Sequence, residues 1–428
     1  MPAGPGISPV SRRVGAEKMG KPVAARKTFA TGGLPRSIVM LGLVSLLMDV
    51  SSEMIHGLLP VFLVVVLGAS KLTVGLIEGL GEATAAITKL FSGLISDRLG
   101  KRKVLVVLGY GLGTLSKPFF ALAPTPVWVL GARFMDRVGK GIRGAPRDAL
   151  IGDLAPTGMR GAAYGLRQSL DNVGAFLGPL LAMALMALSG DNFRLIFWLA
   201  LIPGAGAVLV LVLFAREPAH VAPAATRARL DLHLLRRMGP LFCSVVAVGG
   251  VLTLARFSEA FLILRAEDRG LALALAPLVL VVINIVSSLS AYPVGLLADR
   301  MEKRQLLIAG FVVLMLADLV LMLGTDIWMI FAGVALWGLH LGLSQGLLAA
   351  LVAETAPADL RASAFGVFNL VNGLMLLAAS VLAGLLWQSA GAQVTFFAGA
   401  LITGLGLVAF GAFGLHRRKG PQPGEKSN

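Results

Sequence analysis

The densest group of residues that could do chemistry is a run of charges inside the apolar stretch 126–152. Arg133, Arg137 and Lys140 are spaced by four and three residues, so a helix would place them on one face. Guanidinium groups bind carboxylates and phosphates through paired hydrogen bonds, and an unpaired cation within a membrane is costly. Arg133 and Arg137 therefore need carboxylates from other segments or an anionic substrate.

A second group lies in the apolar stretch 37–67, where Asp49, Glu53 and His56 fall within a helical wedge of roughly 60°. An ionised group there costs at least ~2.5–3.5 kcal/mol to insert into a membrane, so the three face a polar cavity or one another. Such a cluster can bind and release protons for coupling. The alternative is a polar contact that only holds this segment to a neighbour.

Two further glutamates extend the proton-coupling set. Glu82 shares a helix face with Glu78 and Lys89. We expect Glu82 to take part in coupling, Glu78 to lie in water near the outer surface, and Lys89 to pair with an acid on another segment. Glu259 lies 206 residues after Glu53, at a similar place in the second half of the chain, and we include it in the coupling set.

The second half of the chain carries fewer charges than the first. Asp171 corresponds to Asn372 at an offset of 201 residues, while Arg167 and Asp171 are one helical turn apart and can neutralise each other. We expect a charged first half that couples protons and a hydrogen-bonding second half that fits the substrate. The residues expected to bind substrate are Arg133, Arg137, Lys140, Asp171, Asn369 and Asn372.

The composition places these groups in a membrane. Of the 428 residues, 56% are hydrophobic and 14% are charged, whereas soluble domains carry about 25% charged residues. The net charge of +15 comes from short clusters between apolar runs, which indicates membrane topology and not nucleic-acid binding. A single cysteine, Cys243, excludes an intramolecular disulfide. We expect no metal site, since the single cysteine makes a thiolate site unfavourable and no cluster has the ligand density of a dedicated metal site. We expect no cofactor and no enzymatic activity. The sequence lacks a P-loop for ATP-driven pumping and a nucleophile–base set for catalysis.

Twelve apolar stretches have about the 20 residues or more that a membrane-spanning helix needs. They predict an all-α integral membrane protein with twelve transmembrane helices, over residues 37–67, 72–97, 104–123, 126–152, 162–187, 194–215, 239–265, 271–298, 305–323, 327–353, 362–387 and 391–415. Lys and Arg concentrate in every second connection, which predicts that those connections and both termini are cytoplasmic.

A polar, proline-containing segment divides the stretches six and six. The predicted divisions are a basic disordered tail (1–36), a six-helix bundle (37–215), a cytoplasmic linker (216–238) with a short surface helix near 230–237, a second six-helix bundle (239–415) and a cytoplasmic tail (416–428).

One motif occurs in both halves: residues 93–103 read GLISDRLGKRK and residues 295–304 read GLLADRMEKR. Asp97 and Asp299 are 202 residues apart, which indicates an internal duplication. An aspartate in a basic cluster can face the N-terminus of a neighbouring helix, so we interpret the motif as a latch that holds one conformation. The alternative is a positive anchor that only sets topology. The latch residues are Gly93, Asp97, Arg98, Gly100, Lys101, Arg102, Asp299 and Arg300.

The first of these motifs is similar to the best-known signature of the major facilitator superfamily (MFS), and the resemblance covers nearly all of the chain after residue 36. It implies the MFS fold of two pseudo-repeated six-helix bundles that alternate access, with an arginine of the fourth span in the cavity, for which Arg133 is the nearest match. Gly174-x-x-x-Gly178-Pro179 resembles the family's antiporter motif, although its closing glycines are absent, and a packing seam explains the same residues.

A narrower resemblance rests on three segments: Asp49-Val-Ser-Ser-Glu53-Met, Gly139-Lys140-Gly141-Ile142-Arg143 and Ser258-Glu259 through Arg265. They are similar to a bacterial subgroup that includes magnetosome-associated permeases and transporters linked to iron or siderophores.

We therefore expect a proton-coupled secondary transporter for a small anionic solute or metal chelate, such as an organic acid, a siderophore or an iron complex. The alternatives are a proton-driven multidrug exporter, an iron-related magnetosome-type permease and a non-transporting membrane receptor or scaffold. The expected partners are the solute, protons and lipid, and the expected state is a monomer. The expected location is the bacterial cytoplasmic (inner) membrane or an intracytoplasmic vesicle (magnetosome) membrane.

Overall fold

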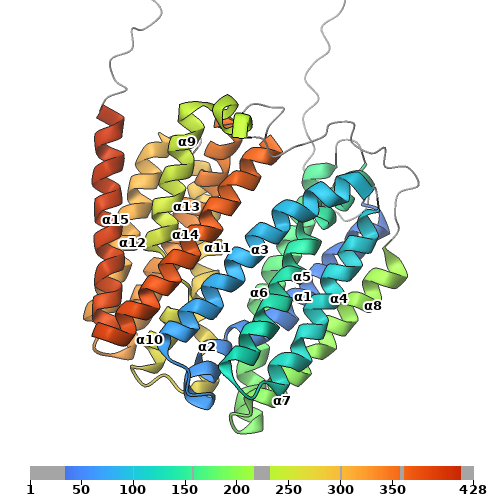
Figure 1. The fold of residues 1–428 in the computed structure, drawn as a ribbon, viewed down its shortest axis with the longest axis horizontal. Coiled ribbons are helices and arrows are strands. Elements are labelled where there is room, and N and C mark those ends of the chain that lie inside the picture. The colour runs from blue at the N-terminus through green and yellow to red at the C-terminus, as the bar shows by residue number, and fades with distance from the viewer. Residues whose placement is uncertain are drawn as a thin grey trace, which may run out of the picture. The chain divides into compact units, whose positions relative to one another are not determined.

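The computed structural model describes residues 34–99, 101–156, 159–215, 232–298, 301–356 and 361–415. Within these ranges the chain forms helices joined by short connections, and no strand occurs among them (Figure 1). Three predicted segments lie largely or wholly outside the described residues. They are the first tail up to residue 33, the linker from 216 to 231, and the second tail from 416 to 428.

The helices of the first half are α1 (Arg36–His56), α2 (Leu59–Val61), the π-helical turn η1 (Phe62–Val66), α3 (Lys71–Leu99), α4 (Arg102–Leu122), α5 (Pro126–Leu154), α6 (Arg160–Ser189), α7 (Phe193–Leu199) and α8 (Leu201–Phe214). The helices of the second half are α9 (Leu232–Ala255), α10 (Ala260–Glu267), the 3-10 turn η2 (Leu273–Leu275), α11 (Leu278–Ala298), α12 (Lys303–Leu323), α13 (Ile327–Thr355), α14 (Arg361–Ala390) and α15 (Ala392–Leu415).

The two halves repeat at a fixed offset. The first and last residues of α4, α5 and α6 recur 201 residues later as those of α12, α13 and α14. The internal duplication inferred from the paired motifs is therefore visible in the helix boundaries themselves.

Each predicted apolar stretch coincides with helical structure, and within the described ranges ten helical segments are long and apolar enough to cross a membrane. The helices α3 and α5 have 29 residues each and are absent from that set of ten, since both carry several charged side chains. The largest boundary difference is at α9, which begins seven residues before the predicted span at residue 239. Gly239 breaks α9 with a φ of +79°, so the turns before it match the short helix predicted near 230–237.

Helices pack within each half and also across the halves. In the first half α4 and α3 pack on α5, and α1 packs on α6. In the second half α13 packs on α11 and α12. Across the halves α3 lies against α14, where a Cβ on Gly384 would be 2.8 Å from the Leu72 Cα and Gly75 faces the Ser380 carbonyl. These glycines let the two helices approach closely.

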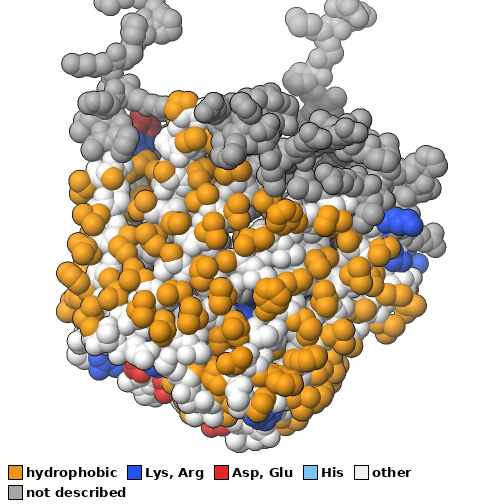
Figure 2. All heavy atoms as spheres, viewed as in Figure 1, with side chains coloured by type: hydrophobic (Ala, Val, Ile, Leu, Met, Phe, Trp, Pro, Cys, Tyr) orange, Lys and Arg blue, Asp and Glu red, His pale blue; other side chains and the backbone are white. Residues whose placement is uncertain are grey.

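Hydrophobic side chains cover most of the face shown in Figure 2, and Lys, Arg, Asp and Glu lie mainly near its lower edge and at its upper left and right. Large apolar residues such as Leu115, Leu289 and Val408 are more than half exposed on the helical body. An apolar outer surface with helices beneath it is what a bilayer requires, because lipid cannot satisfy exposed polar groups.

Candidate functional site

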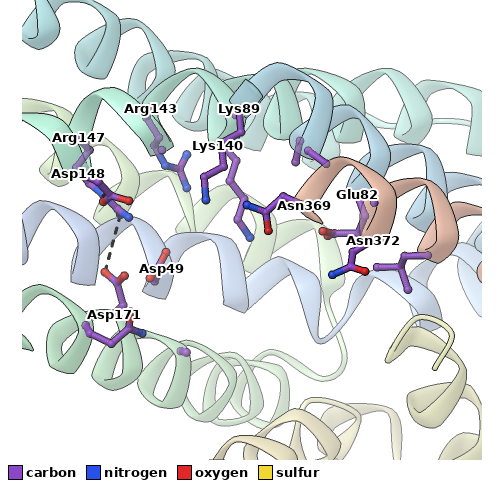
Figure 3. A pocket seen from close by; sticks show the side chains of 18 of the residues that line it. Asp49, Glu82, Lys89, Lys140, Arg143, Arg147, Asp148, Asp171, Asn369 and Asn372 are labelled. Carbon is purple, nitrogen blue, oxygen red and sulfur yellow. Dashed lines mark hydrogen bonds and ion pairs between the residues drawn. The ribbon is translucent and has the colours of Figure 1, made fainter. Parts of the chain in front are cut away.

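A cavity of about 570 Å³ lies between the two halves. Its walls come from α1, α3, α5 and α6 on one side and from α9 and α14 on the other (Figure 3). Six cationic side chains and five carboxylates line it: Lys89, Lys140, Arg143, Arg147, Arg167 and Arg256, with Asp49, Glu53, Glu82, Asp148 and Asp171.

The arginines of α5 form a ladder of ion pairs with α3. Arg133 pairs with Glu78 at 2.5 Å and Arg137 pairs with Glu82 at 3.1 Å, so a spacing of four residues on both helices aligns two pairs. Gly81 makes room, because a Cβ there would lie 3.2 Å from Arg133 Cγ. Carboxylates from another segment therefore neutralise both arginines, and neither arginine lines the cavity.

This ladder corrects the expectation for Glu78. Its side chain is buried, with 1% of its surface exposed, and does not lie in outer water. Glu82 lies at the ladder's second step and also reaches the cavity (Figure 3).

Asp49 and Glu53 of α1 both line the cavity, as the predicted wedge requires. The His56 ring nitrogen Nδ1 lies 3.9 Å from a Glu53 carboxylate oxygen. Glycines of α6 pack against this wedge: a Cβ on Gly174 would lie 2.9 Å from the Asp49 Cβ, and one on Gly178 would lie 2.7 Å from the Glu53 Cβ. The partial antiporter motif therefore forms a packing seam beneath the acids.

A second cluster of ion pairs joins α5 and α6. Arg167 lies 3.1 Å from Asp171 and 3.4 Å from Asp148, and Arg147 lies 3.2 Å from Asp148 and 4.0 Å from Asp171. Figure 3 shows the contact between Arg147 and Asp171 at one end of the cavity. The predicted pairing of Arg167 with Asp171 is confirmed, and Asp171 is shared by two arginines.

Lys89 and Lys140, unlike those arginines, have no ion pair among the described residues. Both line the cavity and are exposed there, and neither has a carboxylate oxygen within 4.0 Å among the residues that the structure describes. The expected partner of Lys89 on another helix is therefore not found in the described part of the chain. Asn369 and Asn372 of α14 also line the cavity, and Asn372 Oδ1 has no hydrogen-bond partner there (Figure 3).

The cavity is closed at the end of the molecule that carries α2 and α10. There Lys71 of α3 lies 3.7 Å from Asp268 and 5.4 Å from the Trp387 ring centroid, which ties the first half to the second. A Cβ on Gly57 would meet Pro277 at 2.8 Å. Toward the other end, the lining reaches Asp148 and Arg167, within about two turns of the connection between α5 and α6.

Comparison with known proteins assigns the chain to a protein family. The sequence model of the Major Facilitator Superfamily matches residues 41–379 and 257–428. The chain belongs to the Major Facilitator Superfamily. An uncharacterised MFS-type transporter from Methanocaldococcus jannaschii is 31% identical over 381 residues, which cover 87% of this chain and 94% of that protein.

Two further MFS proteins are similar over most of their length. The inner membrane transport protein YajR of Escherichia coli is 25% identical over 404 residues, covering 88% of this chain and 83% of YajR. The crystal structure of a bacterial homologue of the human lysosomal transporter Spinster, inward-facing and occupied, superposes with a TM-score of 0.75 at 16% identity, covering 91% of this chain and all of that one. The resemblance inferred from the signature motif is confirmed, and the chain is a multi-pass membrane protein whose family carries out secondary transport.

The MFS signature lies at the end where the cavity approaches the surface. A Cβ on Gly93 would lie 3.4 Å from the Ala145 Cβ of α5, Lys101 is exposed, and Arg102 forms an ion pair with Asp153. The side chains of Asp97 and Arg98 lie outside the described residues, as do Gly100, Asp299 and Arg300. Their predicted latch role stays a prediction.

The duplicated half of this MFS chain repeats the ion pair beside the signature. Lys303 pairs with Glu354, and both residues lie 201 positions after Arg102 and Asp153. The second-half motif lacks the glycine of the first, but it keeps a cation and a carboxylate at equivalent places.

Two further ionisable residues, Glu259 and Lys117, lie outside the cavity lining. Glu259 lies in the break between α9 and α10, next to the start of α10, and does not line the cavity. Lys117 of α4 is a functional candidate that the sequence analysis missed: it is 1% exposed and lies 2.9 Å from Asp136 and 3.3 Å from the Ser52 hydroxyl. The available signal was a lone lysine inside the apolar stretch 104–123.

Proposed function

We propose that this MFS protein transports a small anionic solute by alternating access, coupled to protons. The observation that carries the proposal is the pair Lys89 and Lys140, which line the cavity without a carboxylate partner among the described residues. A solute carboxylate or phosphate would supply a partner through charge-assisted hydrogen bonds. Asn369 and Asn372 on the facing wall would bind its neutral polar groups.

The ion pairs of Arg133 and Arg137 support the assignment of the lysines to the solute. Glu78 and Glu82 neutralise Arg133 and Arg137, so we assign direct contact with the solute to Lys140 and give the two arginines the task of holding α5 against α3. Lys140 lies on the same face of α5 about one turn beyond Arg137, past the end of the ladder, where it lines the cavity.

For protons, we propose the acids of α1. Asp49 has no ion pair, and Glu53 has only His56 within 4.0 Å, among the described residues. Carboxylates that face a cavity inside a membrane without a fixed cation are suited to exchange protons during transport. Glu82 and Glu259 are the further candidates for this set.

The orientation follows from the basic residues. Lys101, Arg102 and Lys303 lie at the end where the cavity approaches the surface, and the positive-inside rule places that end in the cytoplasm. We therefore propose twelve spans with both termini cytoplasmic and an inward-facing conformation, in a bacterial inner membrane as the name of YajR states for that relative.

The test is gradient-driven flux in inverted membrane vesicles, screened across organic acids, phosphorylated compounds, ferric chelates and cationic dyes. Wild type is compared with Lys140→Gln and with Lys303→Gln, a lysine outside the cavity lining whose partner Glu354 is largely exposed. We expect flux of an anion that is lost in Lys140→Gln and kept in Lys303→Gln. Flux of cationic dyes that survives Lys140→Gln would indicate a multidrug exporter instead. No flux of any solute from folded protein would indicate a receptor or scaffold.

Coupling is tested in the same vesicles. With an anion that moves, Glu53→Gln is expected to abolish accumulation driven by the proton gradient while leaving exchange of solute down its own gradient. Accumulation at the wild-type level in Glu53→Gln would remove Glu53 from the proton path.

A further inference from the structure

A carboxylate in the second half of the molecule has no partner at all in the described residues. Asp318 lies in the outer part of α12 with 0% of its surface exposed, and neither carboxylate oxygen has a hydrogen bond or an ion pair there. It does not line the cavity. A Cβ on Gly399 of α15 would lie 2.6 Å from Asp318 Oδ2, so the glycine leaves the space that the carboxyl group fills.

The helices around Asp318 offer no cation to neutralise it. Residues 392–415 of α15 contain no ionisable side chain. On α13, His340 is bonded to the Gly310 carbonyl at 2.9 Å and Glu354 pairs with Lys303. Arg265 of α10 is buried and donates its hydrogen bonds to the carbonyls of Leu321, Met322 and Gly324 at the end of α12, so it forms no ion pair with Asp318. The other charged groups are Arg304 in the first turn of α12, and Arg256 and Glu259 in the break between α9 and α10.

An ionised carboxylate at such a place is costly. An isolated carboxylate that is buried without a cation or a hydrogen-bond donor takes up a proton instead of staying ionised. A neutral carboxylic acid fits the packing seen here without a counter-ion.

Phe257 connects this group to the cavity. Its ring and Asp318 both converge on Gly399, since the Phe257 Cε1 atom would lie 3.3 Å from the same added Cβ. Phe257 lies in the break between α9 and α10, next to Arg256, which lines the cavity. The centroid of the Phe257 ring also lies 5.4 Å from that of Trp337, whose indole Nε1 is buried and has no hydrogen-bond partner among the described residues.

We propose that Asp318 is a second proton-binding site, separate from the acids of α1, and that Phe257 transmits its state to Arg256. In the packing seen here the carboxyl group holds its proton. When the O–H bond breaks, the proton leaves on a water molecule as hydronium, and the carboxylate left behind needs a hydrogen-bond donor. The Trp337 indole N–H, on a ring that packs against Phe257, is the unpartnered donor that the carboxylate would take up, and this rearrangement would shift Phe257 and with it the helix break.

The test is infrared difference spectroscopy on the purified full-length protein between neutral and alkaline pH, which requires no transported solute. We expect the carbonyl stretch of buried carboxylic acids in the wild type at neutral pH to contain one component that is missing in Asp318→Asn and present in Glu53→Gln. The control is Asp326→Asn, at an exposed carboxylate that begins α13, which should keep the band. An unchanged band in Asp318→Asn would overturn the proposal.

A second pair of variants covers the case in which Asp318→Asn does not fold. Gly399→Ala pushes a methyl group against the carboxyl oxygen, whereas Gly404→Ala on the same helix meets only Met315 Sδ at 3.7 Å. We expect the pH midpoint of the band to shift in Gly399→Ala and to stay in place in Gly404→Ala. The same midpoint in both variants would overturn the proposal. Because neither readout uses solute flux, the outcome is independent of whether anion transport is found.

Discussion

Breaking the ion pair between Glu78 and Arg133 should destabilise the protein strongly. Both side chains are buried, with 1% and 4% of their surfaces exposed. Arg133→Met would leave the Glu78 carboxylate without its cation, and Glu78→Met would leave the guanidinium without its acid. Glu78 Oε1 and Arg133 Nε have no other hydrogen-bond partner among the described residues, so the surviving charge finds no substitute.

The expected size follows from measured buried pairs. Removing one partner of a buried pair costs about 3–5 kcal/mol, while replacing both by apolar residues of similar volume is often neutral. Each kcal/mol moves the unfolding temperature by about 2–4 °C in a unit of 150–250 residues, so each single variant should lose about 6–20 °C. The double variant, Glu78→Met with Arg133→Met, should recover most of that loss.

The assay is the temperature at which half of the purified protein in detergent is no longer monodisperse. Lys303→Met is the control, because its partner Glu354 is 56% exposed and such pairs contribute about 0–1 kcal/mol. The reasoning is refuted if the double variant is as unstable as the sum of the single variants, or if the single variants lose no more than Lys303→Met.

Two further predictions concern the helix contacts around the cavity. Gly178→Ala should cost about 1–3 kcal/mol, because its methyl would meet the Glu53 Cβ at 2.7 Å; Gly165→Ala on the same helix meets nothing within 4 Å and should be at least as stable as the wild type in the same assay. Lys71→Glu should separate α2 from α10 by placing two carboxylates together, and adding Asp268→Lys should restore the contact. Distances between spin labels on α2 and α10 would check this, and an unchanged distance in Lys71→Glu would show that the pair does not hold the closed end.

Much of the fold was predictable because it depends on local patterns. Long apolar runs set the helices, and the offset of 201 between the halves appears in both the motifs and the boundaries. Periodicity also grouped the right residues, since Asp49, Glu53, Lys140 and Asp171 all reach the cavity.

Spacing predicted the pair within one helix, Arg167 with Asp171, but not the pairing of charges between helices. Which carboxylate meets Arg133 depends on the rotation and tilt of α3 against α5, and a single helix's sequence does not determine these. Glu78 was therefore expected in water but lies in the ladder, and Lys89 was expected to be paired but has no partner in the described residues. Lys117 was missed for a related reason, because its acid, Asp136, lies on another helix.

The most direct test of the central claim is equilibrium binding of a transported anion to the purified protein. A charge-assisted hydrogen bond contributes about 1.5–3 kcal/mol, so Lys89→Gln and Lys140→Gln should each weaken binding by about 10- to 100-fold. Lys303→Gln, outside the cavity lining, should bind as the wild type does. Equal affinity in wild type, Lys89→Gln and Lys140→Gln would contradict the assignment of these two lysines to the solute.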